Sequence, residues 1–145
     1  MQQTLPRLVL SLLVSVTTVL ALTTVETPSA ASDTLVHPEW GSTSAKNATV
    51  KRGCHQYAYS YTVTPPEGDW ALETFLVGPG GKASGSGYFV TGKDALAGTS
   101  TWRLCRHTVR GGLYTIEAKL SVQNGAELVE GWLPPSTFRL RKPRL

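Results

Sequence analysis

The sequence predicts an all-β protein: an antiparallel sandwich of about seven short strands, preceded by a cleaved signal peptide. Residues 113–122 alternate between apolar and polar side chains, which is the period of a half-buried strand. Other short apolar stretches recur every ~8 to 12 residues between Gly- and Pro-rich breaks. No stretch of about eleven or more residues has the apolar spacing of three and four that a helix requires. Seven strands in this length favour a sandwich over a small barrel.

The first part of the chain has the features of an export signal. Arg7 precedes an apolar run over residues 8–22, Pro28 follows it, and Ser29-Ala30-Ala31 provides the small residues that signal peptidase requires. The run is shorter than the ~20 residues that span a bilayer, which argues against a membrane anchor. We therefore expect cleavage near Ala31, no transmembrane segment after processing, and a secreted, extracellular protein.

The remaining chain is predicted to form one domain. We expect residues 1–31 to be the signal peptide, residues 32–47 to be an irregular N-terminal arm, and residues 48–145 to be the sandwich. The whole chain has 14 Lys and Arg and 10 Asp and Glu, and removal of Arg7 and Glu26 leaves the net charge at +4. A charge this small provides no argument for a nucleic-acid partner.

The strands follow from alternation and breaks, taken in chain order. We expect strands at residues 54–63, 70–77, 88–90, 99–109, 113–122, 128–133 and 136–142. Residues 82–87 are rich in Gly and Ser and are interpreted as a loop or a weak edge strand. Asn124-Gly125 is a strong hairpin signal, and Pro134-Pro135 must interrupt the returning strand or displace it to an edge.

The aromatic residues of the first strand allow two interpretations. Tyr57, Tyr59 and Tyr61 share one face, whereas Gln56 and its even-numbered neighbours form a more polar face. The tyrosines are either core residues or an exposed stripe that stacks on sugar rings, and the polarity of the opposite face favours the core.

The residues around Tyr114 resemble the tyrosine corner of immunoglobulin-like domains, in which a Tyr hydroxyl caps the backbone of the preceding turn. Trp70, at the start of the next predicted strand after the tyrosines, stands where such domains keep a core Trp. The sequence departs from antibody domains at Ile116, where the second core cysteine would be. The resemblance implies a fold and no particular activity.

Cys54 and Cys105 are expected to form a disulfide, because an even number of cysteines in an exported chain normally pairs. Alternation places both on the outer face of their strands. The immunoglobulin-like topology implies that these two strands are antiparallel neighbours, so that the bridge is a cross-strand link. The alternative is a zinc site that also uses His55 and His107, but His55 points through the sheet away from Cys54. We expect no metal and no cofactor.

No catalytic motif is visible in the sequence, which contains neither a Gly-x-Ser-x-Gly elbow nor a His-Glu-x-x-His pattern. We therefore expect a non-catalytic binding or interaction module, secreted or cell-wall-associated, whose partner is an extracellular protein or glycan. The alternatives are a carbohydrate-binding module and a small secreted hydrolase. Trp40 and Trp132, both in loop-like contexts, are the candidate ligand-binding aromatics.

Four basic residues lie at the C-terminus, namely Arg139, Arg141, Lys142 and Arg144. They allow two interpretations. They protect an exposed edge strand from pairing with another chain, or they hold the protein on an anionic surface polymer or membrane surface.

Overall fold

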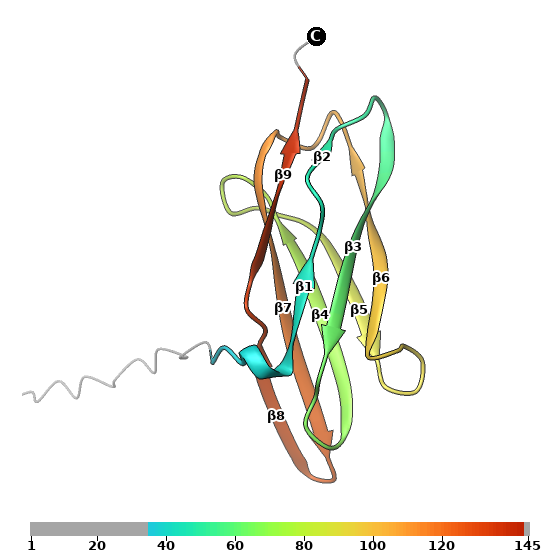
Figure 1. Ribbon diagram of the computed structural model, residues 1–145, viewed down its shortest axis with the longest axis vertical. Helices are drawn as coiled ribbons and strands as arrows, with labels where there is room; N and C mark the ends of the chain where they lie inside the picture. The colour runs from blue at the N-terminus through green and yellow to red at the C-terminus, as the bar shows by residue number, and fades with distance from the viewer. Residues whose placement is uncertain (1–34, 144–145) are drawn as a thin grey trace, which may run out of the picture. The chain divides into compact units, whose positions relative to one another are not determined.

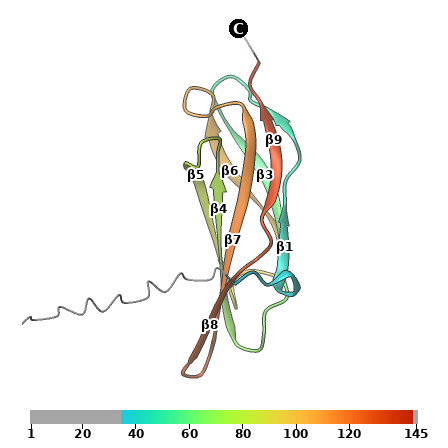
Figure 2. The ribbon, with the colours of Figure 1, turned by 90° about the vertical axis from the view of Figure 1, so that its left-hand side faces the viewer.

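The computed structural model describes residues 35–143 and shows two β-sheets packed face to face (Figures 1 and 2). The predicted signal peptide therefore lies outside the described residues, and so does Arg144. The elements are the 3-10 helix η1 (Pro38–Trp40) and the strands β1 (Gly41–Ser44), β2 (Ala48–Thr49), β3 (Cys54–Val63), β4 (Asp69–Val77), β5 (Ala83–Val90), β6 (Ala97–Cys105), β7 (Gly112–Asn124), β8 (Glu127–Trp132) and β9 (Ser136–Arg141). The prediction of an all-β sandwich is confirmed.

One sheet has the strand order β1-β3-β6, and the other has the order β2-β9-β7-β4-β5, with β8 also paired to β7. All pairings are antiparallel except that of β2 with β9. β8 pairs with the second half of β7 and β9 with the first half. Pro134-Pro135 separates the two partner strands, as predicted, because proline has no N–H to donate to a continuous ladder.

The seven strands expected from the sequence correspond to β3 through β9. The alternation in β7 is confirmed, because Tyr114, Ile116, Ala118, Leu120 and Val122 are all buried. β5 is an edge strand, and packing against the core explains why two of its positions are glycine. A Cβ at Gly85 would lie 2.9 Å from Cδ1 of Trp102, and one at Gly87 would overlap the Tyr59 hydroxyl. The strand therefore needs glycine in order to pack across the core.

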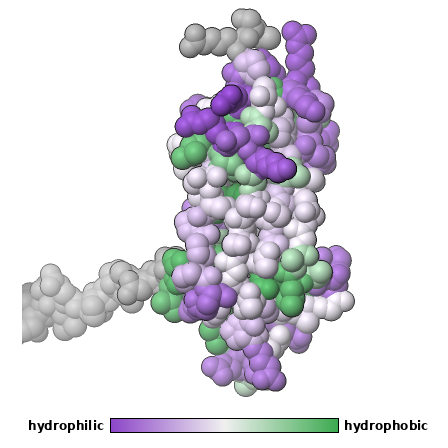
Figure 3. Space-filling view, viewed as in Figure 1, coloured by the Kyte–Doolittle hydropathy of each residue, from purple (hydrophilic) through white to green (hydrophobic). Residues whose placement is uncertain are grey.

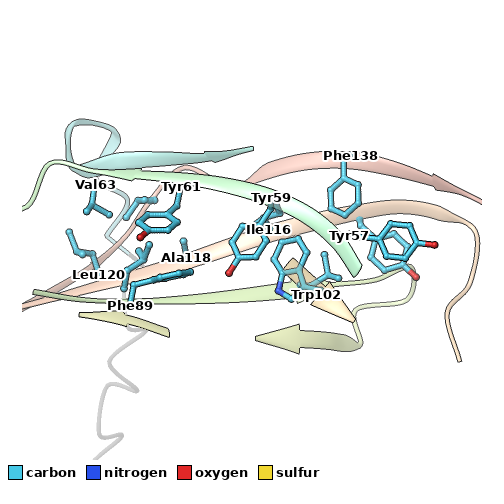
Figure 4. Packing of buried hydrophobic residues seen from close by; sticks show 14 of the residues in the cluster. Tyr57, Tyr59, Tyr61, Val63, Phe89, Trp102, Ile116, Ala118, Leu120 and Phe138 are labelled. Atoms are coloured by element: carbon cyan, nitrogen blue, oxygen red, sulfur yellow. The ribbon is translucent and has the colours of Figure 1, made fainter. Parts of the chain in front are cut away.

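The core lies between the two sheets, and nine of its 21 buried hydrophobic residues are aromatic (Figure 4). Tyr59 stacks on Trp102 with ring centroids 3.7 Å apart, and Tyr61 lies 4.1 Å from Phe89. The Tyr59 hydroxyl is 2.8 Å from Oγ1 of the fully buried Thr74, which links the two sheets. The interpretation of the β3 tyrosines as core residues is confirmed.

The segment expected to be an irregular arm contains ordered structure. η1 buries Trp40, whose ring stacks on His37 at 3.7 Å, and β1 pairs with β3. Only Thr43 of β1 is buried, and its hydroxyl lies 2.7 Å from that of Ser136. A four-residue strand with a single inward side chain, itself polar, has no apolar period, which is why the sequence did not reveal it.

The hydrogen bond expected of Tyr114 is present, because its buried hydroxyl donates to the carbonyl of Arg110 at 2.9 Å. Trp70 is also buried, at the start of β4. β6 ends at Cys105, earlier than predicted, because the amides of Thr108 and Val109 turn back to the Cys105 carbonyl.

Candidate functional site: the basic end of the sandwich

Cys54 and Cys105 form the predicted disulfide. They are direct partners in the register of β3 and β6, so the bridge links two neighbouring strands of one sheet. Both sulfurs lie within 4.8 Å of a ring nitrogen of His107. The sulfurs are bonded to each other and offer no thiolate, so this group has no zinc-binding chemistry while the disulfide is intact. His55 contacts the Arg52 carbonyl instead, at 2.6 Å.

Basic residues gather at the end of the sandwich where β3 begins and β6 and β9 end, uppermost in Figure 1. We call this the basic end and define it by Lys51, Arg52, Arg103, Arg106, Arg110, Arg139, Arg141 and Lys142. All are exposed except Arg106, which is half-buried. The described residues contain 12 Lys and Arg, because Arg7 and Arg144 of the 14 lie outside them, so this end holds two thirds of them.

The acidic residues lie elsewhere. Of the eight described Asp and Glu, Glu73 and Glu117 lie in the middle of β4 and β7. The other six lie toward the opposite end, on η1, in the β3–β4 and β5–β6 connections, at the start of β4 and on the β7–β8 hairpin: Glu39, Glu67, Asp69, Asp94, Glu127 and Glu130. Figure 3 shows strongly hydrophilic side chains at both ends of the face formed by β1, β3 and β6, and weakly polar ones between them. A small net charge therefore conceals a large separation of charge.

The cations of the basic end have no carboxylate partners among the described residues. Between residues 35 and 143, the two carboxylates in contact with a basic side chain are Glu39, which contacts His37, and Glu130, which contacts Lys119, and both lie away from this end. The side-chain hydrogen bonds that the cations of the basic end make with described residues go to backbone carbonyls instead. Unpaired cations keep their full attraction for an external anion, because no neighbouring negative charge offsets it.

Arg106 fixes the geometry of this end. Its guanidinium donates to the Val50 carbonyl at 3.3 Å and to the Pro143 carbonyl at 2.7 Å, and Nζ of Lys142 donates to the Val109 carbonyl at 3.1 Å. Together with the disulfide, these bonds join the turn before β3, the turn after β6 and the segment after β9.

The structure bears on the two interpretations of the C-terminal basic residues. Arg139 and Arg141 project outward, since Phe138 and Leu140 are buried as expected. β9 is not an edge strand at this point, however, because β2 pairs with it at Leu140 and Arg141. The side-chain amide oxygen of Asn47 also accepts a hydrogen bond from the Arg139 amide at 2.6 Å. The edge that these arginines were expected to protect is already covered, which weakens the edge-protection interpretation.

The two candidate aromatics differ in their environment. Trp40 is buried and has no exposed ring face to offer to a ligand, contrary to its interpretation as a surface residue. Trp132 is half-buried on the outer face of the larger sheet, with its ring centroid 6.1 Å from that of Phe75. It borders a shallow hollow of about 330 Å³ that Val36 and Glu117 also line.

Charged and aromatic residues are neighbours across this outer face. The register places Glu73 of β4 between Lys119 of β7 and the exposed Tyr88 of β5. Hydrogen bonds from Lys119 and Ser121 hold the pKa of the Glu130 carboxyl below its usual value. Glu73 and Glu117 have no such partner among the described residues.

Sequence reasoning missed five members of the basic end: Lys51, Arg52, Arg103, Arg106 and Arg110. The available signal was the cystine. Pairing Cys54 with Cys105 brings Lys51 and Arg52, which precede the first cysteine, to the same end of the sheet as Arg103 and Arg106, which flank the second. In the described part of the chain, no helix is long and apolar enough to cross a membrane. No protein-family model matches the chain, and a search of curated proteins found no match either.

Proposed function

We propose that this protein is an exported, non-catalytic binding module with an immunoglobulin-like fold, held on an anionic extracellular polymer by its basic end. The observation that carries the proposal is the cluster of eight Lys and Arg at one end, without a described carboxylate among them. The tyrosine corner and the β3–β6 pairing support the immunoglobulin-like topology. The disulfide supports an oxidising, extracellular compartment.

The physical basis is long-range attraction between clustered charges and a polyanion. A Lys or Arg near an anionic surface contributes about 1 kcal/mol, and the attraction fades within a Debye length of about 8 Å at physiological salt. Because Arg106 and the cystine fix the three segments that form this end, little conformational entropy is lost when it binds.

The test is retention of the pure domain on dextran sulfate, with uncharged dextran as the control polymer. Lys51, Arg52, Arg110 and Arg141 are exposed, and none of their side chains makes a described hydrogen bond. Replacing all four with Gln should weaken binding about a thousandfold, the equivalent of ~4 kcal/mol. A matched variant that exchanges Arg and Lys at these four positions keeps the charge and should bind like the wild type.

A further control separates local charge from net charge. Lys93→Gln removes one cation from the opposite end and should leave binding nearly unchanged, whereas Arg52→Gln should weaken it several-fold. Equal effects of the two substitutions, or equal binding to dextran and dextran sulfate, would contradict the proposal.

The second candidate is a carbohydrate-binding module, favoured by the position of Trp132 beside Phe75 on a sheet face that also carries Glu73 and Glu117. Aromatic rings stack on the apolar faces of sugars, and carboxylates accept hydrogen bonds from hydroxyls. Glycan-array binding that Trp132→Ala abolishes and the four-Gln variant retains would favour this function. The expectation that the protein is not an enzyme stays a prediction, as does the alternative of a small hydrolase.

A further inference from the structure

β3 has an open edge over part of its length. β1 pairs with β3 only from Val63 to Ser60, and the chain then crosses to the other sheet, where β2 pairs with β9. The first half of β3 keeps its partner β6 on one side and has no strand on the other.

The register shows which backbone groups face this open edge. The amide of Val63 bonds to Leu96 on the β6 side, and the amide of Thr64 bonds to Trp40 on the β1 side. Odd-numbered residues of β3 therefore direct their backbone groups toward β6, and even-numbered residues direct theirs toward β1. Beyond the end of β1, the N–H and C=O groups of Gln56 and Ala58 face the open edge, and no described residue bonds to them.

A groove runs along this edge, with a volume of about 880 Å³. Residues 45–49, which cross between the sheets, line one side of it, and Gln56 and Ala58 line the other. Two lysines, Lys46 and Lys51, also line the groove, and no lining residue is acidic. The groove therefore combines a row of free backbone hydrogen-bonding groups with a positive charge.

We propose that this groove binds an extended acidic segment of a partner protein, which adds to the β1-β3-β6 sheet as a strand beside β3. Backbone bonds to Gln56 and Ala58 provide the pairing, and Lys46 and Lys51 select for acidic side chains. The open stretch from Cys54 to Tyr59 accommodates about six residues at ~3.3 Å each. The site shares Lys51 with the basic end but differs from the proposed retention on a polyanion, because it requires a peptide backbone beside β3.

The test uses a capped hexapeptide of alternating threonine and glutamate, monitored through the amide signals of the full domain by NMR. In the free protein, the amides of Gln56 and Ala58 should exchange rapidly with solvent, and those of Tyr57 and Tyr59 slowly. The peptide should shift and protect the first pair. The same peptide with its strand-facing amides N-methylated keeps every charge, and should bind about three- to tenfold more weakly for each bond lost.

A matched pair of variants tests the edge directly. Ala58→Pro removes the N–H that faces the groove without removing a bond to β6, and should weaken peptide binding by a similar factor. Thr101→Pro, directly across the ladder from Ala58, removes an N–H from the far edge of the same sheet and should leave binding unchanged. If Ala58→Pro does not fold, the N-methylated peptide still decides the question.

Three results would overturn the proposal: binding insensitive to N-methylation, peptide shifts confined to the β6 edge, and no shift at saturating peptide. Dimerisation that protects Gln56 and Ala58 without peptide would assign the edge to a second copy of the chain and overturn it as well. Loss of dextran sulfate binding in the four-Gln variant leaves the backbone pairing untested, because none of those substitutions removes a backbone group from β3. That variant also lacks the groove residue Lys51, so the peptide is tested on the wild type and on the proline variants.

Discussion

Removing the Cys54–Cys105 bridge is expected to destabilise the domain strongly. The two cysteines are 51 residues apart, and closing a loop of this length lowers the entropy of the unfolded chain by an amount worth about 4 kcal/mol. A domain of this size has a total free energy of unfolding of about 5 to 15 kcal/mol. Because the entropy of unfolding is ~2 cal/mol/K per residue, losing this free energy should lower Tm by roughly 15 °C.

The assay is urea unfolding of the double variant Cys54→Ala/Cys105→Ala beside the oxidised wild type. Reduced wild-type protein is the matched control, because it loses the bridge without a change of side chain, and its stability should fall by the same amount. Alkylation of the unreduced, exported protein should add no mass, since both sulfurs are bonded. A loss of less than ~1 kcal/mol in both the variant and the reduced protein would refute the account of the bridge as an unfolded-state constraint.

Three further predictions concern the core and the corner. Tyr59→Phe leaves the buried Thr74 hydroxyl without its partner and should lower the free energy of unfolding by about 1 to 3 kcal/mol. The same change combined with Thr74→Val should cost less than the two single losses added together. Additive losses in urea unfolding would contradict the hydrogen bond. Gly87→Ala should be at least as damaging, because its Cβ would overlap the Tyr59 hydroxyl, and a stability equal to that of the wild type would show that β5 packs elsewhere. Tyr114→Phe removes the bond to the Arg110 carbonyl and should cost about 0.5 to 1.5 kcal/mol, with faster amide exchange in the turn that precedes β7; an unchanged turn would argue against the corner.

The sequence predicted most of the strands because their burial alternates with the period of a β-strand. The seven segments expected correspond to β3 through β9, and the Tyr114 hydrogen bond and the Cys54–Cys105 bridge are both present. β5 was ambiguous because Gly85 and Gly87 make room for aromatic side chains on other strands. That requirement comes from tertiary packing, which a local pattern does not contain.

The N-terminal segment and the candidate sites were harder to predict. Trp40 and β1 pack against residues far along the chain, and their small polar neighbours give no periodic signal. Only the C-terminal part of the basic end was visible, because the other cations are scattered along the sequence and meet through the β3–β6 register. The open edge at Gln56 and Ala58 depends on where β1 leaves β3, which no composition reveals.

The most direct test of the central claim is the salt dependence of binding to dextran sulfate. If the basic end holds the protein on polyanions, log K should fall linearly with log salt concentration, and the slope should decrease by several units when Lys51, Arg52, Arg110 and Arg141 are all replaced with Gln. The charge-retaining Arg/Lys exchange should keep the wild-type slope. A slope near zero in the wild type, or the same slope in the four-Gln variant, would contradict the assignment of the basic end as the binding site.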